Sequence, residues 1–212
     1  MNDAALTFYT NPQSRGRIVR WMLEEVGAPY DTVVLDYGTT MKAPAYLAIN
    51  PMGKVPAIRH GDTVITEGAA ICAYLADAFP QAGLAPAPAS RLRGPYYRWL
   101  FFAAGPVEAA ASNKALGFVV PPGRERMMGY GSYAEVMHAL EGAVSQGDYL
   151  LGSHFTAADV YLGSHLGFGM QFGTIEKRPA FEAYWARLAA RPAAVRARAM
   201  DDAPTPKPPA TA

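Results

Sequence analysis

The sequence predicts an α/β domain followed by an all-α domain. Three observations support this prediction. Strand and helix signals follow the order β-α-β and then β-β-α over residues 1–80, a stretch rich in Pro, Ala and Gly follows, and only helical periodicity is found after it. The chain has 212 residues, half of them hydrophobic, which is enough to form cores in both parts. We therefore expect domains at 1–82 and 90–200, a linker at 83–89 and a disordered tail at 201–212.

A βαβ unit is expected at the start of the chain. Leu6–Tyr9 is an alternating, aromatic stretch that is typical of a strand. Helical periodicity begins at Ser14 and ends at Gly27, and Tyr30–Leu35 is a second β-branched, apolar stretch. Two strands joined by a helix pair in parallel, so we expect these two strands to be parallel neighbours.

A hairpin and a helix are expected next. Val55–His60 and Thr63–Thr66 flank Gly61-Asp62, which is a hairpin signal. Apolar residues then recur with helical spacing from Ile71 to Phe79, and Pro80 ends that pattern.

Helical signals fill the second half. They cover Ser90–Leu116, a less regular Arg124–Gln146, Thr156–Phe172 and Pro179–Ala190. The third of these begins with "FTAAD", in which Asp159 is placed to return a hydrogen bond to its N-cap Thr156, which is a folding device.

Composition excludes several classes of protein. The formal net charge is +1, which gives no indication of nucleic-acid binding, and the apolar stretches are too short to span a membrane. The N-terminus does not resemble a secretory signal. Cys72 is the single cysteine, so we expect no disulfide framework, no CxxC redox pair and a reducing, cytoplasmic compartment. His138, His154 and His165 lack metal-ligand spacing, and no metal is expected.

The stretch "NPMGKVPAI" places Pro56 at the start of a strand, where its missing N–H is tolerated. A cis bond before Pro56 would turn the chain and leave the main chain of Val55 open for an extended peptide. A trans proline that simply begins the strand is the alternative.

Two helix starts offer polar groups. In "ITEGAAICAYL", Glu67 and Gly68 precede a helix whose N–H groups and partial positive charge can hold a carboxylate, and Glu67 could hold an ammonium beside it. In "NPQSRGR", the Ser14 hydroxyl at a helix start could donate to a thiolate. The structural alternatives are that Glu67 only favours a first helical turn and that Ser14 is only an N-cap.

The motifs together resemble the glutathione transferase superfamily. "FYTNPQSRGRIVRWMLEEVGAPY", "NPMGKVPAI" and "ITEGAAICAYLADAFP" are similar to its thioredoxin-like N-terminal domain, and "FTAADVYLGSHL" is similar to its helical C-terminal domain. The similarity covers nearly the whole chain before the tail and is greatest to bacterial members. It implies glutathione-transferase architecture.

The resemblance also implies a glutathione site. Pro56 is expected to be cis, and Val55 to pair its backbone with the cysteinyl unit. Glu67 and Gly68 are expected to hold the γ-glutamyl end, although the family usually has serine at the second position. Loss of that serine hydroxyl costs about 1–2 kcal/mol if nothing replaces it. Lys42 or Lys54 could reach the glycyl carboxylate.

The residue that activates the thiol is assigned by the same resemblance. Ser14 is the first choice, Asn11 the second and Tyr9 the third. The second substrate is expected between the domains, where clefts are common. Its walls are expected to come from aromatic side chains: Tyr97, Phe102, Phe118, Phe168 and Phe172.

The resemblance implies a homodimeric transferase that uses glutathione as co-substrate against an apolar electrophile, for example in detoxification, or to reduce a peroxide or disulfide. A non-catalytic binding or scaffold protein on the same fold is the alternative. A thioredoxin-type redox protein is disfavoured by the missing CxxC.

Overall fold

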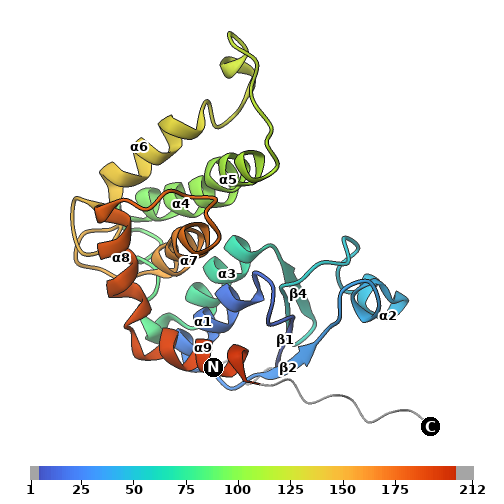
Figure 1. Ribbon diagram of the computed structural model, residues 1–212. Coiled ribbons are helices and arrows are strands. Elements are labelled where there is room, and N and C mark those ends of the chain that lie inside the picture. Colours follow the sequence, from blue (N-terminus) through green and yellow to red (C-terminus); the bar gives the residue numbers. More distant parts are fainter. Residues whose placement is uncertain (1–4, 204–212) are drawn as a thin grey trace.

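The computed structural model describes residues 5–203, and these form two domains (Figure 1). The first contains a four-stranded sheet made of β1 (Leu6–Thr10), β2 (Asp31–Val34), β3 (Ala57–His60) and β4 (Thr63–Thr66). The strand order is β2-β1-β3-β4. The β1–β2 pair is parallel and the other two pairs are antiparallel, so the expected βαβ unit and hairpin are confirmed.

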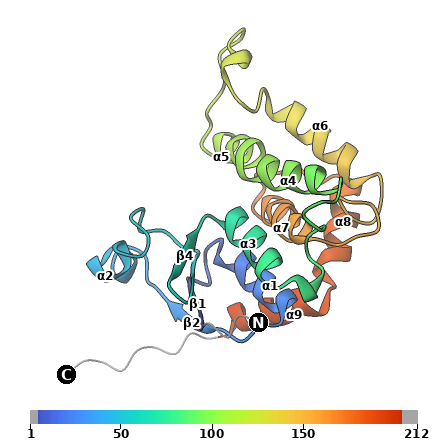
Figure 2. The ribbon, with the colours of Figure 1, turned by 180° about the vertical axis from the view of Figure 1, so that it is seen from behind.

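Helices cover both faces of this sheet. Helices α1 (Gly16–Val26) and α3 (Gly68–Ala78) lie between the sheet and the helical domain, whereas the short α2 (Pro44–Leu47) lies on the opposite side in both views (Figures 1 and 2). Side chains alternate along β1, so Phe8 enters the main core while Tyr9 enters a smaller core with Met41 and Tyr46.

The second domain is helical, as predicted. Its helices are α4 (Arg93–Phe102), α5 (Glu108–Ala115), α6 (Tyr133–Val144), α7 (Ala157–Phe172), α8 (Pro179–Ala189) and α9 (Pro192–Asp202). The long helical stretch expected at Ser90–Leu116 is largely confirmed, because the chain is helical without interruption from Arg93 to Ala115. A π-helical turn at Ala103–Val107 lies within this stretch, where Pro106 has no N–H for the helical ladder.

Asp159 holds the start of α7 in place, as its motif predicted. Its carboxylate accepts from the N–H of Thr156 at 2.8 Å and from the Thr156 hydroxyl at 3.0 Å. It also accepts from the Leu150 N–H and the Tyr184 hydroxyl, each at 2.8 Å. Four donors explain how a fully buried carboxylate is tolerated at the centre of the helical domain.

Helix α9 corrects the predicted boundary of the tail. The tail was expected to begin at Asp201, but Asp201 and Asp202 belong to α9, and Asp201 is buried against Arg20 of α1. Residues 204–212 lie outside the described part of the chain. Helix α9 runs beside α1 in both views, so the C-terminal helix packs on the N-terminal domain (Figures 1 and 2).

Candidate glutathione site

A cleft of about 1070 Å³ separates the two domains. The N-terminal domain contributes the start of α1 and the loop before β3, and the helical domain contributes α5, α7, α8 and α9. The cleft brings together five of the residues selected from the sequence: Ser14, Lys54, Val55, Phe168 and Phe172.

The "NPMGKVPAI" loop is held rigidly at one end of this cleft. The Asn50 side chain accepts from the Met52 N–H at 3.1 Å and donates to the Lys54 carbonyl at 2.8 Å. The Tyr46 hydroxyl donates to the same carbonyl at 2.6 Å. These bonds fix the backbone immediately before Val55.

The Val55–Pro56 peptide bond is cis, as expected from the resemblance. Pro56 is buried, whereas Val55 is half-buried and lines the cleft. Within residues 5–203, no backbone hydrogen bond uses the N–H or C=O of Val55. The main chain of Val55 is therefore open to an extended peptide laid along it.

Glu67 and Gly68 form a second polar corner at the start of α3. Glu67 has φ 65° and ψ 116°, and it is the one described non-glycine residue with positive φ. Such a conformation costs about 1–3 kcal/mol and is concentrated at functional sites. Gly68 begins the helix, whose first N–H groups lack helical acceptors. The corner lies outside the lining of the cleft.

Ser14 lies in the turn that starts α1, and its hydroxyl already has partners. It donates to the Asn11 carbonyl at 2.6 Å and accepts from the Gly16 N–H at 2.9 Å. To donate to a thiolate, the hydroxyl has to leave the Asn11 carbonyl. The Asn11 side chain donates to the Leu35 carbonyl and accepts from the Gln13 N–H, so it organises the turn and does not line the cleft.

Other residues that were selected from the sequence do not line the cleft, because they pack, form hydrogen bonds or are exposed elsewhere. Tyr9 is 7% exposed and packs against Tyr46 on the far face of the sheet. The Lys42 ammonium donates to the Met52 carbonyl at 3.0 Å. Three aromatic residues expected as walls also do not line the cleft: Tyr97, Phe102 and Phe118. Tyr97 lies on the outer face of α4, Phe102 packs on Trp99, and Phe118 follows α5 in an exposed loop.

A charged cluster beside Ser14 was missed by sequence reasoning. Arg15 Nη2 lies 2.6 Å from Glu108 Oε1, which joins the start of α1 to the start of α5. The other Glu108 oxygen lies 3.6 Å from His165 Nδ1. Burial, and secondarily Arg15, lowers the pKa of the His165 imidazole to about 3, so the ring is neutral. These residues are distant in sequence, and no motif connects them.

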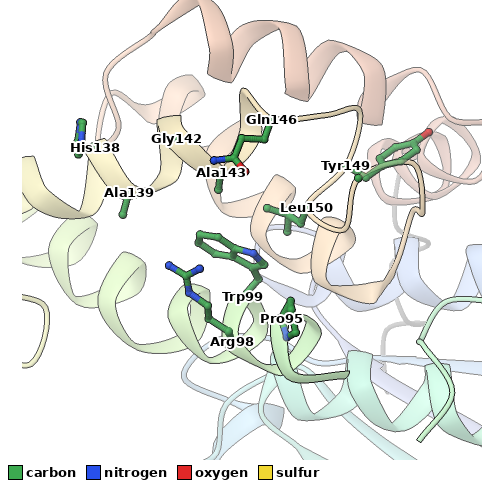
Figure 3. A pocket seen from close by; sticks show the side chains of 11 residues that line it. Pro95, Arg98, Trp99, His138, Ala139, Gly142, Ala143, Gln146, Tyr149 and Leu150 are labelled. Atoms are coloured by element: carbon green, nitrogen blue, oxygen red, sulfur yellow. The ribbon is translucent and has the colours of Figure 1, made fainter. Parts of the chain in front are cut away.

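A second, smaller hollow of about 470 Å³ lies within the helical domain (Figure 3). Trp99 of α4 faces Ala139 and Ala143 of α6 across it, and Arg98 lies beside the indole. No residue selected from the sequence lines this hollow.

The described part of the chain shows no group of three or more His, Cys, Asp or Glu side chains placed to hold a metal. No helix described here is long and apolar enough to cross a membrane. Cys72 is fully buried, and burial raises the pKa of its thiol, so the interpretation of Cys72 as a core residue is confirmed.

The fold and the loop before β3 define a class of protein. A thioredoxin-like sheet is followed by a helical domain, and a cis-proline and the start of α1 face the cleft between them. Residues 14–78 match the family "Glutathione S-transferase, N-terminal domain", and residues 110–192 match "Glutathione S-transferase, C-terminal domain". The chain belongs to the glutathione transferase family.

Individual relatives are similar to this protein over most of its chain. Glutathione S-transferase 3 of Zea mays is 30% identical over 206 residues, which covers 90% of this chain and 91% of the maize protein. A sphingomonad glutathione S-transferase, solved in complex with glutathione, has a TM-score of 0.74 at 29% identity and covers 92% of this chain and 98% of its own. Glutathione transferase URE2P6 of Phanerochaete chrysosporium, in complex with oxidized glutathione, has a TM-score of 0.76 at 27% identity. The match covers 94% of this chain and 99% of the fungal chain.

Proposed function

We propose that the protein is a glutathione S-transferase that binds glutathione at the Val55 and Glu67 corners and directs its thiolate into the cleft. The observation that carries this proposal is the open main chain of Val55 at the cis-proline, on the cleft that also receives the start of α1. The cysteinyl unit pairs with Val55, the γ-glutamyl end lies at Glu67 and Gly68, and Lys54 faces the glycyl carboxylate.

The reaction follows from the groups around the sulfur. The positive end of α1 and the Arg15 guanidinium favour a thiolate over a thiol, and the Ser14 hydroxyl donates to that thiolate once it leaves Asn11. The thiolate attacks an apolar electrophile held against Phe168 and Phe172, or it reduces a peroxide or disulfide. We also propose that the enzyme works in the cytoplasm, where glutathione is kept reduced.

We propose a homodimer as the working assembly, as the family resemblance implies. The outer face of α4 supports this proposal, because Phe101 is 73% exposed there and Tyr97 is 40% exposed. Exposed aromatic side chains on one helix face are typical of a protein interface.

A non-catalytic binding protein is the second candidate. Two observations favour it: Gly68 lacks the family's serine hydroxyl, and the Ser14 hydroxyl is engaged within its own turn. Such a protein would keep the fold and lack turnover.

The deciding experiment measures melting temperature with and without millimolar glutathione and then with S-hexylglutathione. A ligand at about 100 times its dissociation constant stabilises by roughly 2.7 kcal/mol, which is a shift of several degrees for a chain of this size. No shift with either ligand would contradict the proposal. A shift without turnover against any electrophile or peroxide would favour the binding protein.

A further inference from the structure

Gly68 occupies a position where a neighbouring ring leaves little room for a side chain. A Cβ added at residue 68 would lie 3.0 Å from Cε2 of Tyr161 and 3.9 Å from Cζ. Gly68 is not among the described glycines with positive φ, so its backbone does not require glycine. A side chain at residue 68 would therefore require the Tyr161 ring to shift by a few tenths of an ångström.

Tyr161 reaches this position from the other domain. It lies on α7, which packs against α3, and its ring meets the His165 ring edge-to-face at 4.8 Å between centroids. Cε2 is the nearest ring atom, with Cδ2 at 3.8 Å and Cζ at 3.9 Å on either side of it, so the ring edge next to the hydroxyl faces the first residue of α3. Tyr161 is only 7% exposed, which holds the ring in one place.

The hydroxyl of Tyr161 has no hydrogen-bond partner among the described residues. No side-chain hydrogen bond among residues 5–203 involves the Tyr161 hydroxyl. The hydroxyl is not fully enclosed either, because the buried polar atoms without a partner do not include it. Burial raises the pKa of this phenol, and Glu67 and Arg15 are among the charges that act on it. It is a protonated donor at neutral pH, partly accessible, beside the corner formed by Glu67 and Gly68.

We propose that the Tyr161 hydroxyl donates a hydrogen bond to the γ-glutamyl carboxylate of glutathione, in place of the serine hydroxyl that the family usually carries at the position of Gly68. This inference rests on the proposed function. The γ-glutamyl site is then built from both domains: α3 supplies backbone N–H groups, Glu67 faces the ammonium, and α7 supplies the hydroxyl.

The test is Tyr161→Phe, which keeps the ring against Gly68 and removes only the hydroxyl. We expect the dissociation constant of glutathione, measured by calorimetry, to rise roughly tenfold, since one hydrogen bond to a charged group is lost. The melting temperature without ligand should stay the same. The control is Tyr96→Phe, which also removes an unpartnered tyrosine hydroxyl, but one that is fully enclosed and belongs to α4, and it should leave affinity unchanged.

A ligand pair separates this inference from the proposed function. S-hexylglutathione carries the γ-glutamyl group and S-hexyl-cysteinylglycine lacks it, so Tyr161→Phe should weaken only the first. Equal affinity of wild type and Tyr161→Phe for S-hexylglutathione overturns the role of Tyr161 and leaves the proposed function standing. A wild type that binds no glutathione ligand overturns the proposed function and this inference together.

Discussion

Single residues decide where the thiol chemistry can take place. Asn11, Ser14 and Tyr9 lie close together in sequence, yet their surroundings differ. Tyr9 faces the small core, the Asn11 side chain supports the turn, and only Ser14 lines the cleft. Strand alternation explains the first outcome, because a residue next to core-facing Phe8 must point to the opposite face.

Ser14→Ala tests the activating hydroxyl. Removal of a hydrogen bond to a thiolate should lower kcat/KM roughly 10- to 100-fold in a standard conjugation assay, with little change in glutathione affinity. Ser164→Ala is the matched control, because Ser164 also lines the cleft while its hydroxyl donates to the Val160 carbonyl. Unchanged turnover in Ser14→Ala would remove the role given to Ser14.

His165 should make folding stability depend on pH. Its folded pKa of about 3 lies below the ordinary value of 6.5, so between these values the unfolded chain binds a proton that the folded chain does not. The free energy of unfolding should therefore fall as pH drops below 6.5, by up to about 1.4 kcal/mol per pH unit.

Urea midpoints at pH 7.5, 6.0 and 5.0 check this prediction, with His165→Gln as the comparison. Carboxylates such as Asp159 and Asp201, whose pKa values are raised by burial, affect both proteins alike. The wild type should lose more stability than His165→Gln as pH falls. Parallel pH profiles would show that His165 is not the group responsible.

At the scale of elements, α9 is attached to the N-terminal domain by charge. Arg20 and Asp201 form a buried pair at 2.6 Å, with side chains 5% and 1% exposed. Arg17 and Asp202 form a pair at the same distance, with side chains 26% and 58% exposed. The two pairs join the same helices, so burial is the main difference between them.

This difference in burial predicts that loss of the two ion pairs destabilises the protein unequally. Asp201→Ala leaves the Arg20 charge buried without its partner and should destabilise the protein by about 3–5 kcal/mol. Asp202→Ala breaks an exposed pair and should cost about 1 kcal/mol or less. Guanidinium denaturation of the two variants measures both values. A cost for Asp201→Ala as small as that for Asp202→Ala would contradict the importance of this attachment.

At the scale of the whole molecule, the proposed dimer is open to a direct test. Sedimentation of the wild type at micromolar concentration should give a dimer. Phe101→Glu places a charge on the exposed face of α4 and should shift the protein toward monomer. Met127→Glu is the control, because Met127 is 74% exposed but lies between α5 and α6. A monomeric wild type would contradict the dimer.

The sequence by itself determined the order of most elements, the succession of an α/β part by a helical part, and the local devices. Strand alternation, helical spacing, glycine and proline signals and the Thr156–Asp159 cap are short-range properties, so they can be read from neighbouring residues. The resemblance added the cis bond before Pro56. The helix that carries Asp201 was missed, because tertiary packing can override weak local patterns. The π-helical turn at Pro106 was not anticipated either.

The tertiary structure alone decided which residues meet across the cleft. Arg15 precedes α1, Glu108 begins α5 and His165 lies on α7, and Tyr161 meets Gly68 from the opposite domain. Such contacts depend on how whole helices pack, and no spacing in the chain encodes them. The same packing excluded Tyr97, Phe102 and Phe118 from the cleft and left Phe168 and Phe172 on its wall. The glycine that stands where the family usually has serine lies, in the fold, against the ring of Tyr161.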